Sequence, residues 1–368
     1  MKKPQYIKIY NDLLSPINNG ELKEGDQLPT EMELSQKYGV SRITSKKALD
    51  MLSQEGRIIR IAGKGSFVST NAHSFAPERK GTPIIGVVMS NFSSAFGIDF
   101  FSGIQQACQK HESLAVISNA YSNQESETAE ISRLIRMGAC GLILMPLHGL
   151  SYNPAILENL LNNFPMVMAD RFLPGLSVPY VGNDNVHSAE DAIRYLFERG
   201  HKKVAFFSSL ATTSALQERM EGYINAYASS DFSLDKELMV TDIHCTMPGM
   251  NTKEYIQADL ECIKAFFLRN PQVSAGLAAD YWIARFLHTA LRQIEKEIPQ
   301  DFSLICYDQP EELFFDCNYT HIQQNQYQIG YQAANILFRI LENKPLEQEK
   351  HLIDYALVEG TTVSQLIR

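Results

Sequence analysis

Residues 30–54 read TEMELSQKYGVSRITSKKALDMLSQ and predict two short helices separated by a tight turn. Thr30 and Glu33 have the spacing of a capping box, in which each side chain accepts a backbone N–H at the start of a helix. Gly39 is expected to end the first helix, because glycine adopts the left-handed backbone without strain. Ser41 is placed to cap the second helix. That helix presents an apolar face made of Ala48, Leu49 and Leu52.

Another helix and a hairpin flank this pair. Apolar residues recur at spacings of three and four ahead of it, at Tyr6, Ile9, Leu13 and Ile17. After Gly56, residues 58–69 read IIRIAGKGSFVS and predict two short apolar strands joined by a glycine-containing turn. A helix, a helix-turn-helix and a β-hairpin in this order make a winged helix-turn-helix.

Residues 20–68 resemble the N-terminal DNA-binding domain of GntR-type bacterial regulators, and the resemblance extends over nearly all of residues 4–69. It rests on the order and spacing of a Gly-x-Leu-x-x-Gly-x-x-Leu-Pro stretch, the Thr-Glu cap, Gly-Val-Ser-Arg and the Gly-x-Gly of the hairpin tip. We therefore place a DNA-binding domain at residues 1–70.

The start of the helix after Ser41 is expected to read bases, because an α-helix fits the major groove and arginine bonds guanine twice. Its N-terminal dipole also favours a phosphate there. The resemblance implies that Glu31 lies near bases and that the hairpin tip enters the minor groove. Met32 and Lys46 stand where many relatives carry arginine, so the operator need not be a familiar one. The predicted DNA contacts are Glu31, Ser41, Arg42, Ile43, Thr44, Lys46, Gly63, Lys64 and Gly65.

Two other interpretations of the same residues carry less weight. A solvated basic face on a helical subdomain explains the lysines and arginines, but not the cap, the turn and the hairpin together. The Gly-Lys-Gly at 63–65 does not complete a Walker loop, which needs Gly-x-x-x-x-Gly-Lys-Ser/Thr between a strand and a helix.

From residue 84 onward, short apolar runs alternate with helical stretches such as IDFFSGIQQACQKH and SAEDAIRYLFERG. This alternation predicts parallel sheets covered by helices on both faces. Residues 71–83 show no periodicity and are expected to be a linker. The predicted buried strands are IIGVVM, LAVIS, GLILM, PMVMA, KVAFFS, AGLAA and FSLICY.

Residues 84–368 resemble the effector domains of the lac/galactose-repressor family, which share their two-lobed fold with periplasmic sugar-binding proteins. The matching motifs are Asp-Arg at 170–171, Val-x-x-Asp-Asn at 181–185, Arg-x-x-Gly at 219–222 and Tyr-Asp at 307–308. A GntR-type domain joined to such a body is the arrangement of arabinose-repressor-like proteins. The fold class is therefore multidomain: an N-terminal winged helix-turn-helix plus a two-lobed α/β effector-binding and dimerisation domain.

Ligands in doubly wound α/β sheets bind beyond the carboxyl ends of the strands, so polar residues after strands are candidates. Carboxylates and arginines beside aromatic rings suit a sugar, whose hydroxyls need donors and acceptors. The resemblance adds Asp170, Arg219 and Asp308 as family ligand positions. Ion pairs or helix caps would explain the same charged residues, and the phenylalanines fit a core as well. The predicted effector contacts are Ser90, Asn91, Phe92, Phe100, Asp170, Arg171, Arg219, Asp280 and Asp308.

The charge distribution separates the two parts of the chain. The 368 residues carry a formal net charge of −9, yet residues 1–70 hold 11 Lys and Arg against 8 Asp and Glu. A mildly basic part on an acidic chain is compatible with a polyanionic partner. Six scattered cysteines without a Cys-x-x-Cys pair indicate reduced thiols in a cytoplasm. No apolar run reaches about 18 residues, and the start reads as a helix rather than a signal peptide, so no membrane partner is expected.

These observations predict a cytoplasmic, homodimeric repressor of carbohydrate-utilisation genes. It would grip a palindromic double-stranded DNA operator and be released by a small sugar effector. A regulator of the same architecture that responds to a purine or another non-sugar metabolite remains an alternative, as does a ligand-dependent activator. No enzyme, cofactor or metal site is expected, because the sequence has no nucleophile elbow, zinc signature or dinucleotide fingerprint.

Overall fold

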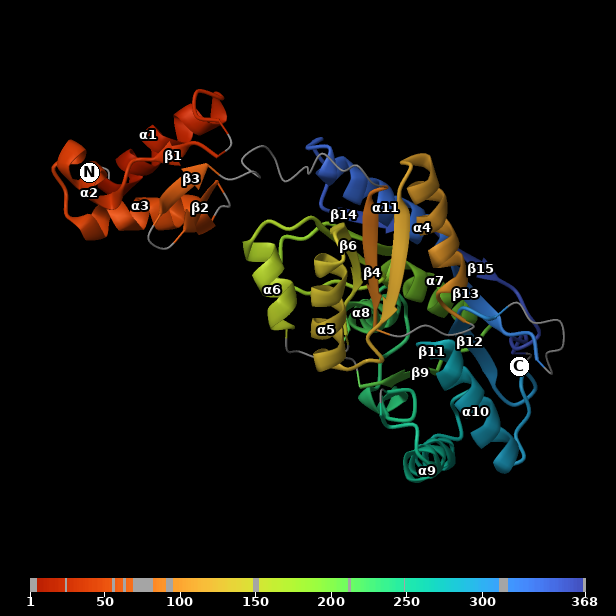
Figure 1. The fold of residues 1–368 in the computed structure, drawn as a ribbon. Coiled ribbons are helices and arrows are strands. Elements are labelled where there is room, and N and C mark those ends of the chain that lie inside the picture. Colours follow the sequence, from red (N-terminus) through yellow and green to blue (C-terminus); the bar gives the residue numbers. More distant parts are fainter. Residues whose placement is uncertain are drawn as a thin grey trace. The chain divides into compact units, whose positions relative to one another are not determined.

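The computed structural model describes residues 5–366 except 24, 55–56, 62–63, 69–81, 91–94, 148–151, 211–212, 248 and 311–316. The chain divides into two compact units, Met1–Gly81 and Thr82–Arg368, which we call the head and the body (Figure 1). The linker predicted at 71–83 lies almost wholly outside the described residues. Among the described residues, no helix is long and apolar enough to cross a lipid bilayer.

The head is a winged helix-turn-helix, as predicted. Its strands form a sheet in the order β1-β3-β2, and both pairings are antiparallel. Apolar side chains from all three helices and the sheet, among them Ile9, Leu34 and Leu49, form one small core. The elements are α1 (Gln5–Asn18), β1 (Gln27–Leu28), α2 (Glu31–Tyr38), α3 (Arg42–Gln54), β2 (Ile58–Ile61) and β3 (Gly65–Val68).

The predicted helix caps are confirmed. The backbone N–H of Thr30 donates to Glu33 Oε2 at 2.7 Å, and that of Glu33 donates to Thr30 Oγ1 at 3.3 Å. Gly39 ends α2 with φ of 63°. The backbone N–H of Thr44 donates to Ser41 Oγ at 3.3 Å, which caps α3. These caps fix where α3 begins, and therefore which side chains stand at its tip.

The first lobe of the body, the N lobe, has a six-stranded parallel sheet in the order β14-β8-β7-β6-β4-β5. α4 and α11 pack on one face and α5 and α6 on the other, so the sheet is covered on both sides (Figure 1). The elements are β4 (Ile84–Met89), α4 (Ile98–Lys110), β5 (Leu114–Asn119), α5 (Gln124–Arg136), β6 (Ala139–Met145), α6 (Pro154–Leu161), β7 (Met166–Ala169), β8 (Tyr180–Asn183), α11 (Gln326–Leu341) and β14 (Lys350–Ile353).

The second lobe, the C lobe, has a sheet in the order β10-β9-β11-β12-β13-β15, parallel except for the β13–β15 pair. A single apolar core joins this sheet to its helices. The elements are α7 (Asn185–Glu198), β9 (Val204–Ser209), α8 (Ser214–Ala228), the 3-10 helix η1 (Lys236–Leu238), β10 (Met239–Ile243), α9 (Lys253–Arg269), β11 (Ala275–Ala278), α10 (Tyr281–Gln293), β12 (Ser303–Tyr307), β13 (Thr320–Gln324) and β15 (Tyr355–Val358).

Three segments of the described chain connect the lobes. They lie at residue 184 between β8 and α7, at residue 325 between β13 and α11, and at residue 354 between β14 and β15. Each crossing is only one residue long, so the two lobes are held close together along one edge. The loops that follow the parallel strands of the two lobes supply the candidate effector-binding residues of the body.

Candidate functional site

The tip of α3 presents one charged and one apolar side chain to solvent. The Arg42 side chain is 69% exposed, and its Nη2 lies 3.6 Å from Glu31 Oε2. Arg60 on β2 also pairs with Glu31, and with Asp50 on α3. Glu31 therefore links the start of α2 to the tip of α3 and to the wing. Its ion pair with Arg42 orients that side chain while leaving it exposed to solvent.

Ile43 is 80% exposed although it is a large apolar residue. It makes no contribution to the core of the head, so folding does not explain it. An apolar side chain at this position suits the methyl group of thymine in the major groove. Lys46 is exposed one turn further on, and the hydroxyls of Ser41 and Thr44 lie 2.9 Å apart. The structure thus gathers the predicted α3 residues on one exposed end.

The described end of the wing turn, at Lys64 and Gly65, packs closely against β1. Gly65 has φ of 119°, and a Cβ on it would lie 2.8 Å from Gln27 Nε2. The Gln27 amide donates to the Lys64 carbonyl at 3.2 Å, which ties the turn to β1 and leaves Lys64 exposed. Gly63 lies outside the described residues.

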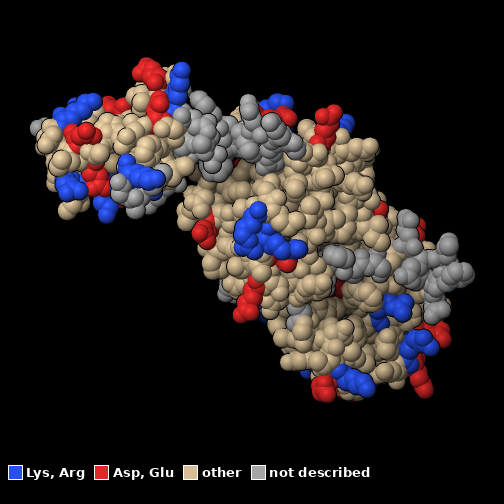
Figure 2. Space-filling model, viewed as in Figure 1, with Lys and Arg blue, Asp and Glu red and all other residues tan. Residues whose placement is uncertain are grey.

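Figure 2 shows basic and acidic side chains interspersed over the visible face of the head. This face is not a uniform basic surface.

In the body, two aspartates follow strands in equivalent ways. Asp170 follows β7 and its N–H donates to Val181 O at 2.9 Å, while Asp308 follows β12 and its N–H donates to Ile322 O at 2.9 Å. Both have a left-handed backbone, with φ of 65° and 53°. Each aspartate is therefore fixed at the carboxyl end of its sheet, as the strand-end rule predicts.

Arg219 on α8 is buried and bonded inside the C lobe. Its Nε donates to Asn185 Oδ1 at 2.8 Å and its Nη1 to the Ala279 carbonyl at 2.6 Å. The guanidinium carbon lies 3.6 Å from the centroid of the Tyr307 ring. The helix begins at Ser214, so Arg219 lies in its second turn rather than at its start. Its two hydrogen bonds join α8 to the start of α7 and to the residue that follows β11.

The two carboxylates near Arg219 differ in burial and in their partners: Asp308 is buried and Asp280 is half-buried. Asp308 accepts from the Gln324 backbone N–H at 3.1 Å and from its side-chain amide at 2.6 Å. Burial raises the pKa of Asp308 to about 6, although these hydrogen bonds and Arg219 oppose the shift. Asp280 caps α10 by accepting from Ile283 N at 2.8 Å, and burial raises its pKa as well.

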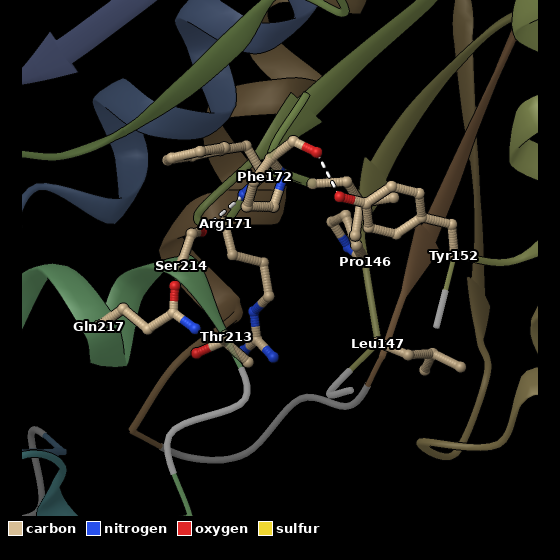
Figure 3. A pocket seen from close by; sticks show the side chains of 10 residues that line it. Pro146, Leu147, Tyr152, Arg171, Phe172, Thr213, Ser214 and Gln217 are labelled. Atoms are coloured by element: carbon tan, nitrogen blue, oxygen red, sulfur yellow. Dashed lines mark hydrogen bonds between the residues drawn. The ribbon is translucent and has the colours of Figure 1, made fainter. Parts of the chain in front are cut away.

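A pocket of about 200 Å³ lies between residues of the two lobes (Figure 3). Arg171, Phe172, Leu173 and Pro174 line it after β7, and Pro146, Leu147 and Tyr152 line it after β6. Thr213, Ser214 and Gln217, at the start of α8, close it from the C lobe. The Phe172 backbone N–H donates to Ser214 Oγ at 2.8 Å across the lobes. The pocket therefore lies where both sheets end.

The predicted effector contacts are only partly brought together. Arg171 lines this pocket, and Asp170 is bonded to it, with Arg171 Nε 3.1 Å from Asp170 Oδ2. The buried Tyr180 hydroxyl donates to the Asp170 carbonyl at 3.1 Å, and burial raises the pKa of this hydroxyl. Within the C lobe, Arg219 donates to the carbonyl of Ala279, the residue before Asp280, and its positive charge opposes the rise in the pKa of Asp280 and of Asp308.

Other predicted contacts have different places. Ser90 is buried at the end of β4, and its carbonyl accepts from Ser122 N at 2.6 Å. Asn91 and Phe92 lie outside the described residues. Phe100 needs a correction: its ring is fully buried in the core between α4 and α11 and packs against Phe96 and Phe101. Phe100 is therefore a core residue, which is the alternative that the sequence left open for the phenylalanines.

Sequence reasoning missed the C-lobe side of the pocket. Thr213 and Ser214 follow β9 and begin α8, so the strand-end rule that selected Asp170 also applied to them. Gln217 lies one turn further along the same helix. Thr213 is a residue type that commonly caps helices, and its Oγ1 accepts from Leu216 N at 3.3 Å. This cap is the sequence signal that could have placed the start of α8 at the pocket.

Comparisons with known proteins agree with this architecture. A family model described as bacterial regulatory proteins of the gntR family matches residues 5–68. A model for periplasmic binding proteins and the sugar-binding domain of the LacI family matches residues 82–359.

Similar proteins share the whole arrangement or the body alone. The arabinose metabolism transcriptional repressor of Geobacillus stearothermophilus is 25% identical over 357 residues, covering 94% of this chain and 93% of that protein. The transcriptional repressor CytR of Escherichia coli K12 is 24% identical, covering 92% of this chain and 98% of that protein. The crystal structure of the transcription regulator CcpA of Lactococcus lactis has a TM-score of 0.66 at 18% identity, covering 77% of this chain and 100% of that one.

Proposed function

The chain belongs to the family of periplasmic binding proteins and LacI-type sugar-binding domains and carries a gntR-family DNA-binding domain, and from this premise we propose that it represses carbohydrate-utilisation genes. A small carbohydrate effector, bound between the lobes, releases it from its operator. The observation that carries the proposal is the pocket that both lobes line, with Arg171 on one side and Ser214 on the other. A ligand in that position bridges the lobes.

In the head, we assign base reading to the exposed end of α3. Arg42 suits a guanine, Ile43 a thymine methyl group, and Lys46 a phosphate. Lys64 and Gly65 at the wing suit the minor groove, where a turn with few side chains fits. The chain acts as a homodimer whose two heads occupy the half-sites of a palindromic operator, because a symmetric pair of readers matches a symmetric site.

In the body, release requires that the effector bind one arrangement of the lobes more tightly than the other. The one-residue crossings at 184, 325 and 354 allow the lobes to change their angle around a single edge. Coupling between effector and operator is then expected to be about 1–3 kcal/mol, or roughly 5- to 150-fold in operator affinity.

The test uses the full-length protein and a pool of random-sequence duplexes. Selection is expected to enrich a palindrome with two half-sites, and fluorescence anisotropy then measures affinity for it with and without each member of a carbohydrate panel. At least one carbohydrate should weaken binding. A protein that prefers no duplex over random DNA, or that no carbohydrate affects, contradicts the proposal. Analytical ultracentrifugation checks the dimer.

A further inference from the structure

The pocket between the lobes is rich in hydrogen-bond donors. Among the described residues that line it, none is an aspartate or a glutamate, and the one charged side chain is Arg171. The aspartate beside this arginine, Asp170, is bonded to its Nε and does not line the pocket. Asp170 therefore holds the inner edge of the guanidinium, and the terminal nitrogens remain for other partners.

The Arg171 side chain is only 16% exposed, and its Nη1 is buried with no hydrogen-bond partner among the residues that the structure describes. Leaving a buried guanidinium nitrogen without a hydrogen-bond acceptor is unfavourable, so a bound ligand that supplies an acceptor here would be stabilised. Figure 3 shows the guanidinium extending towards Thr213, on the opposite wall of the pocket. An oxygen-rich group placed between them would satisfy the arginine.

The opposite wall adds donors from the C lobe. Thr213 Oγ1 accepts from Leu216 N at 3.3 Å, and Ser214 Oγ accepts from Phe172 N at 2.8 Å. Each hydroxyl still has its own hydrogen to donate. Both lie at the N-terminus of α8, a 15-residue helix whose dipole favours negative charge at this end. The Gln217 amide follows one turn later.

From the cavity, the unpartnered guanidinium nitrogen and the donors facing it, we propose that the effector is an acidic carbohydrate, a sugar that carries a phosphate or a carboxylate. This inference rests on the proposed function, because it names the ligand class of the same site. The volume of about 200 Å³ is below the roughly 300–1,000 Å³ of typical ligand pockets. It suits one compact anionic group with part of a sugar ring, whose C–H face lies against Tyr152 and Phe172.

The experiment titrates the full-length protein by calorimetry with inorganic phosphate and with pairs of sugars. Each pair compares a sugar phosphate or a sugar acid with its neutral parent sugar. The two kinds of pair distinguish an effector that carries a phosphate from one that carries a carboxylate. At least one acidic sugar is expected to bind and to release the selected operator. Its neutral parent should bind roughly 10- to 100-fold more weakly, the effect of losing charge-assisted hydrogen bonds.

Two variants test the residues. Arg171→Gln removes the charge, and Gln217→Glu adds a negative charge at an exposed position in the first turn of α8, where an acidic residue favours the helix. Both should weaken binding of the acidic sugar about tenfold or more, and should weaken binding of the neutral parent by a clearly smaller factor. Gln106→Glu, on the exposed surface of α4, is the matched control and should change neither. Because Gln217 is exposed, its variant remains informative if Arg171→Gln fails to fold.

The outcomes separate this inference from the proposed function. If a neutral sugar binds as tightly as its acidic partner and releases the operator, the function stands and the inference falls. The inference also falls if the folded Arg171→Gln or Gln217→Glu variant binds the acidic sugar like the unchanged protein. If sugars of neither class release the operator, both proposals are overturned.

Discussion

Asp170 and Asp308 turn the chain at the edges of the two sheets with the same backbone conformation. Positive φ is uncommon for residues other than glycine, and asparagine and aspartate tolerate it best because their short side chains bond locally. Here the backbone N–H of each aspartate keeps a hydrogen bond to the neighbouring strand, while the carboxylate of Asp170 accepts from Arg171 and that of Asp308 from Gln324. In both lobes, an aspartate with a left-handed backbone therefore ends the strand at the carboxyl edge of the sheet.

Asp308 gives a prediction for stability against pH. Burial raises its pKa to about 6 from the usual 3.8, so between these values the folded state binds the proton more tightly than the unfolded chain. Stability must then fall as pH rises through this window, and the difference corresponds to at most ~3 kcal/mol. Asp308→Asn removes this penalty while keeping an oxygen for Gln324 N. Its stability relative to the unchanged protein should therefore rise from pH 4 to pH 6 and stay level above.

Urea denaturation at a series of pH values measures this difference. The control is Asp231→Asn, at an exposed position on the C lobe. A stability difference for Asp308→Asn that does not change between pH 4 and pH 7 would show that the carboxyl titrates alike in both states.

Arg42 gives a prediction for operator binding. Its guanidinium is exposed and held by Glu31, so it contributes little to folding and is free to bond a base. Arg42→Ala is expected to weaken binding to the selected operator by about 1–3 kcal/mol, the worth of one bidentate base contact. Thermal stability and effector binding should be unchanged. The matched control is Arg194→Ala, an exposed arginine on α7 that pairs with its own helix.

Fluorescence anisotropy at several salt concentrations separates the two roles that Arg42 can have. A lost base contact lowers specific affinity more than affinity for random DNA, whereas a lost phosphate contact lowers both equally and reduces the salt dependence. Equal loss on all sequences would reassign Arg42 from base reading to phosphate binding.

The sequence predicted individual residues best where local chemistry decides the structure. The caps at Thr30 and Ser41 follow from hydrogen bonds within four residues, and the strand-end aspartates follow from the sheet rule. Phe100 was wrongly assigned to the effector site because its aromatic ring suits a hydrophobic core and a sugar-binding site equally, and the sequence alone does not decide between them. The pocket side of α8 was missed because its position depends on how the two lobes meet.

At the scale of the elements, α7 and α8 form the tightest contact around Arg219. A Cβ on Gly222 would lie 2.0 Å from the Val186 carbonyl, so only glycine lets the helices approach this closely. Arg219 lies one turn before Gly222 on the same face of α8 and reaches Asn185 at the start of α7. The Arg-x-x-Gly motif is therefore a packing device that sets the position of the arginine.

Gly222→Ala tests this packing. The added methyl group must push α8 away from α7, which is expected to lower the free energy of unfolding by about 1–3 kcal/mol or more. Thermal denaturation measures the loss. Glu221→Ala, at the neighbouring exposed position of α8, is the control and should change stability by less than about 0.5 kcal/mol. A Gly222→Ala variant as stable as this control would mean that the helices have room to move apart.

The elements that the sequence predicted are the strongly apolar ones. All seven predicted strands are present, and six of them are largely buried apolar runs. The seventh, LAVIS in β5, was wrongly predicted to be buried: β5 lies at the edge of its sheet, and Leu114 and Ile117 are exposed. Strands β13 and β14 were not predicted from the pattern, since THIQQ and KHLI alternate with polar residues. Strand β1 has only two residues and exists through its pairing with β3. Such strands depend on a neighbour that single-sequence patterns do not reveal.

At the scale of the whole body, direct contacts join the lobes beyond the three crossings. Lys350 Nζ on β14 lies 2.7 Å from Glu218 Oε1 on α8, and the Phe172 N–H bonds to Ser214 Oγ close to the pocket. The Glu218 side chain is 11% exposed, and its other oxygen accepts from Asn185 at 3.3 Å. This ion pair therefore favours the arrangement in which the lobes are together.

Removing the lysine should shift the balance between the lobe arrangements. Lys350→Met leaves a mostly buried carboxylate without its cation, which favours an arrangement that hydrates Glu218. If the effector binds the arrangement with the lobes together, its affinity should fall by roughly 3- to 10-fold, and the radius of gyration without effector should increase. Calorimetry and small-angle X-ray scattering measure these two quantities. The control is Lys344→Met, which removes an exposed lysine paired with Glu342 inside the N lobe and should change neither quantity.

The double variant Lys350→Met with Glu218→Gln removes the unpaired carboxylate charge and should recover part of the effector affinity. If affinity and radius both stay unchanged in Lys350→Met, the ion pair does not hold the lobes together, and the crossings alone must set their angle.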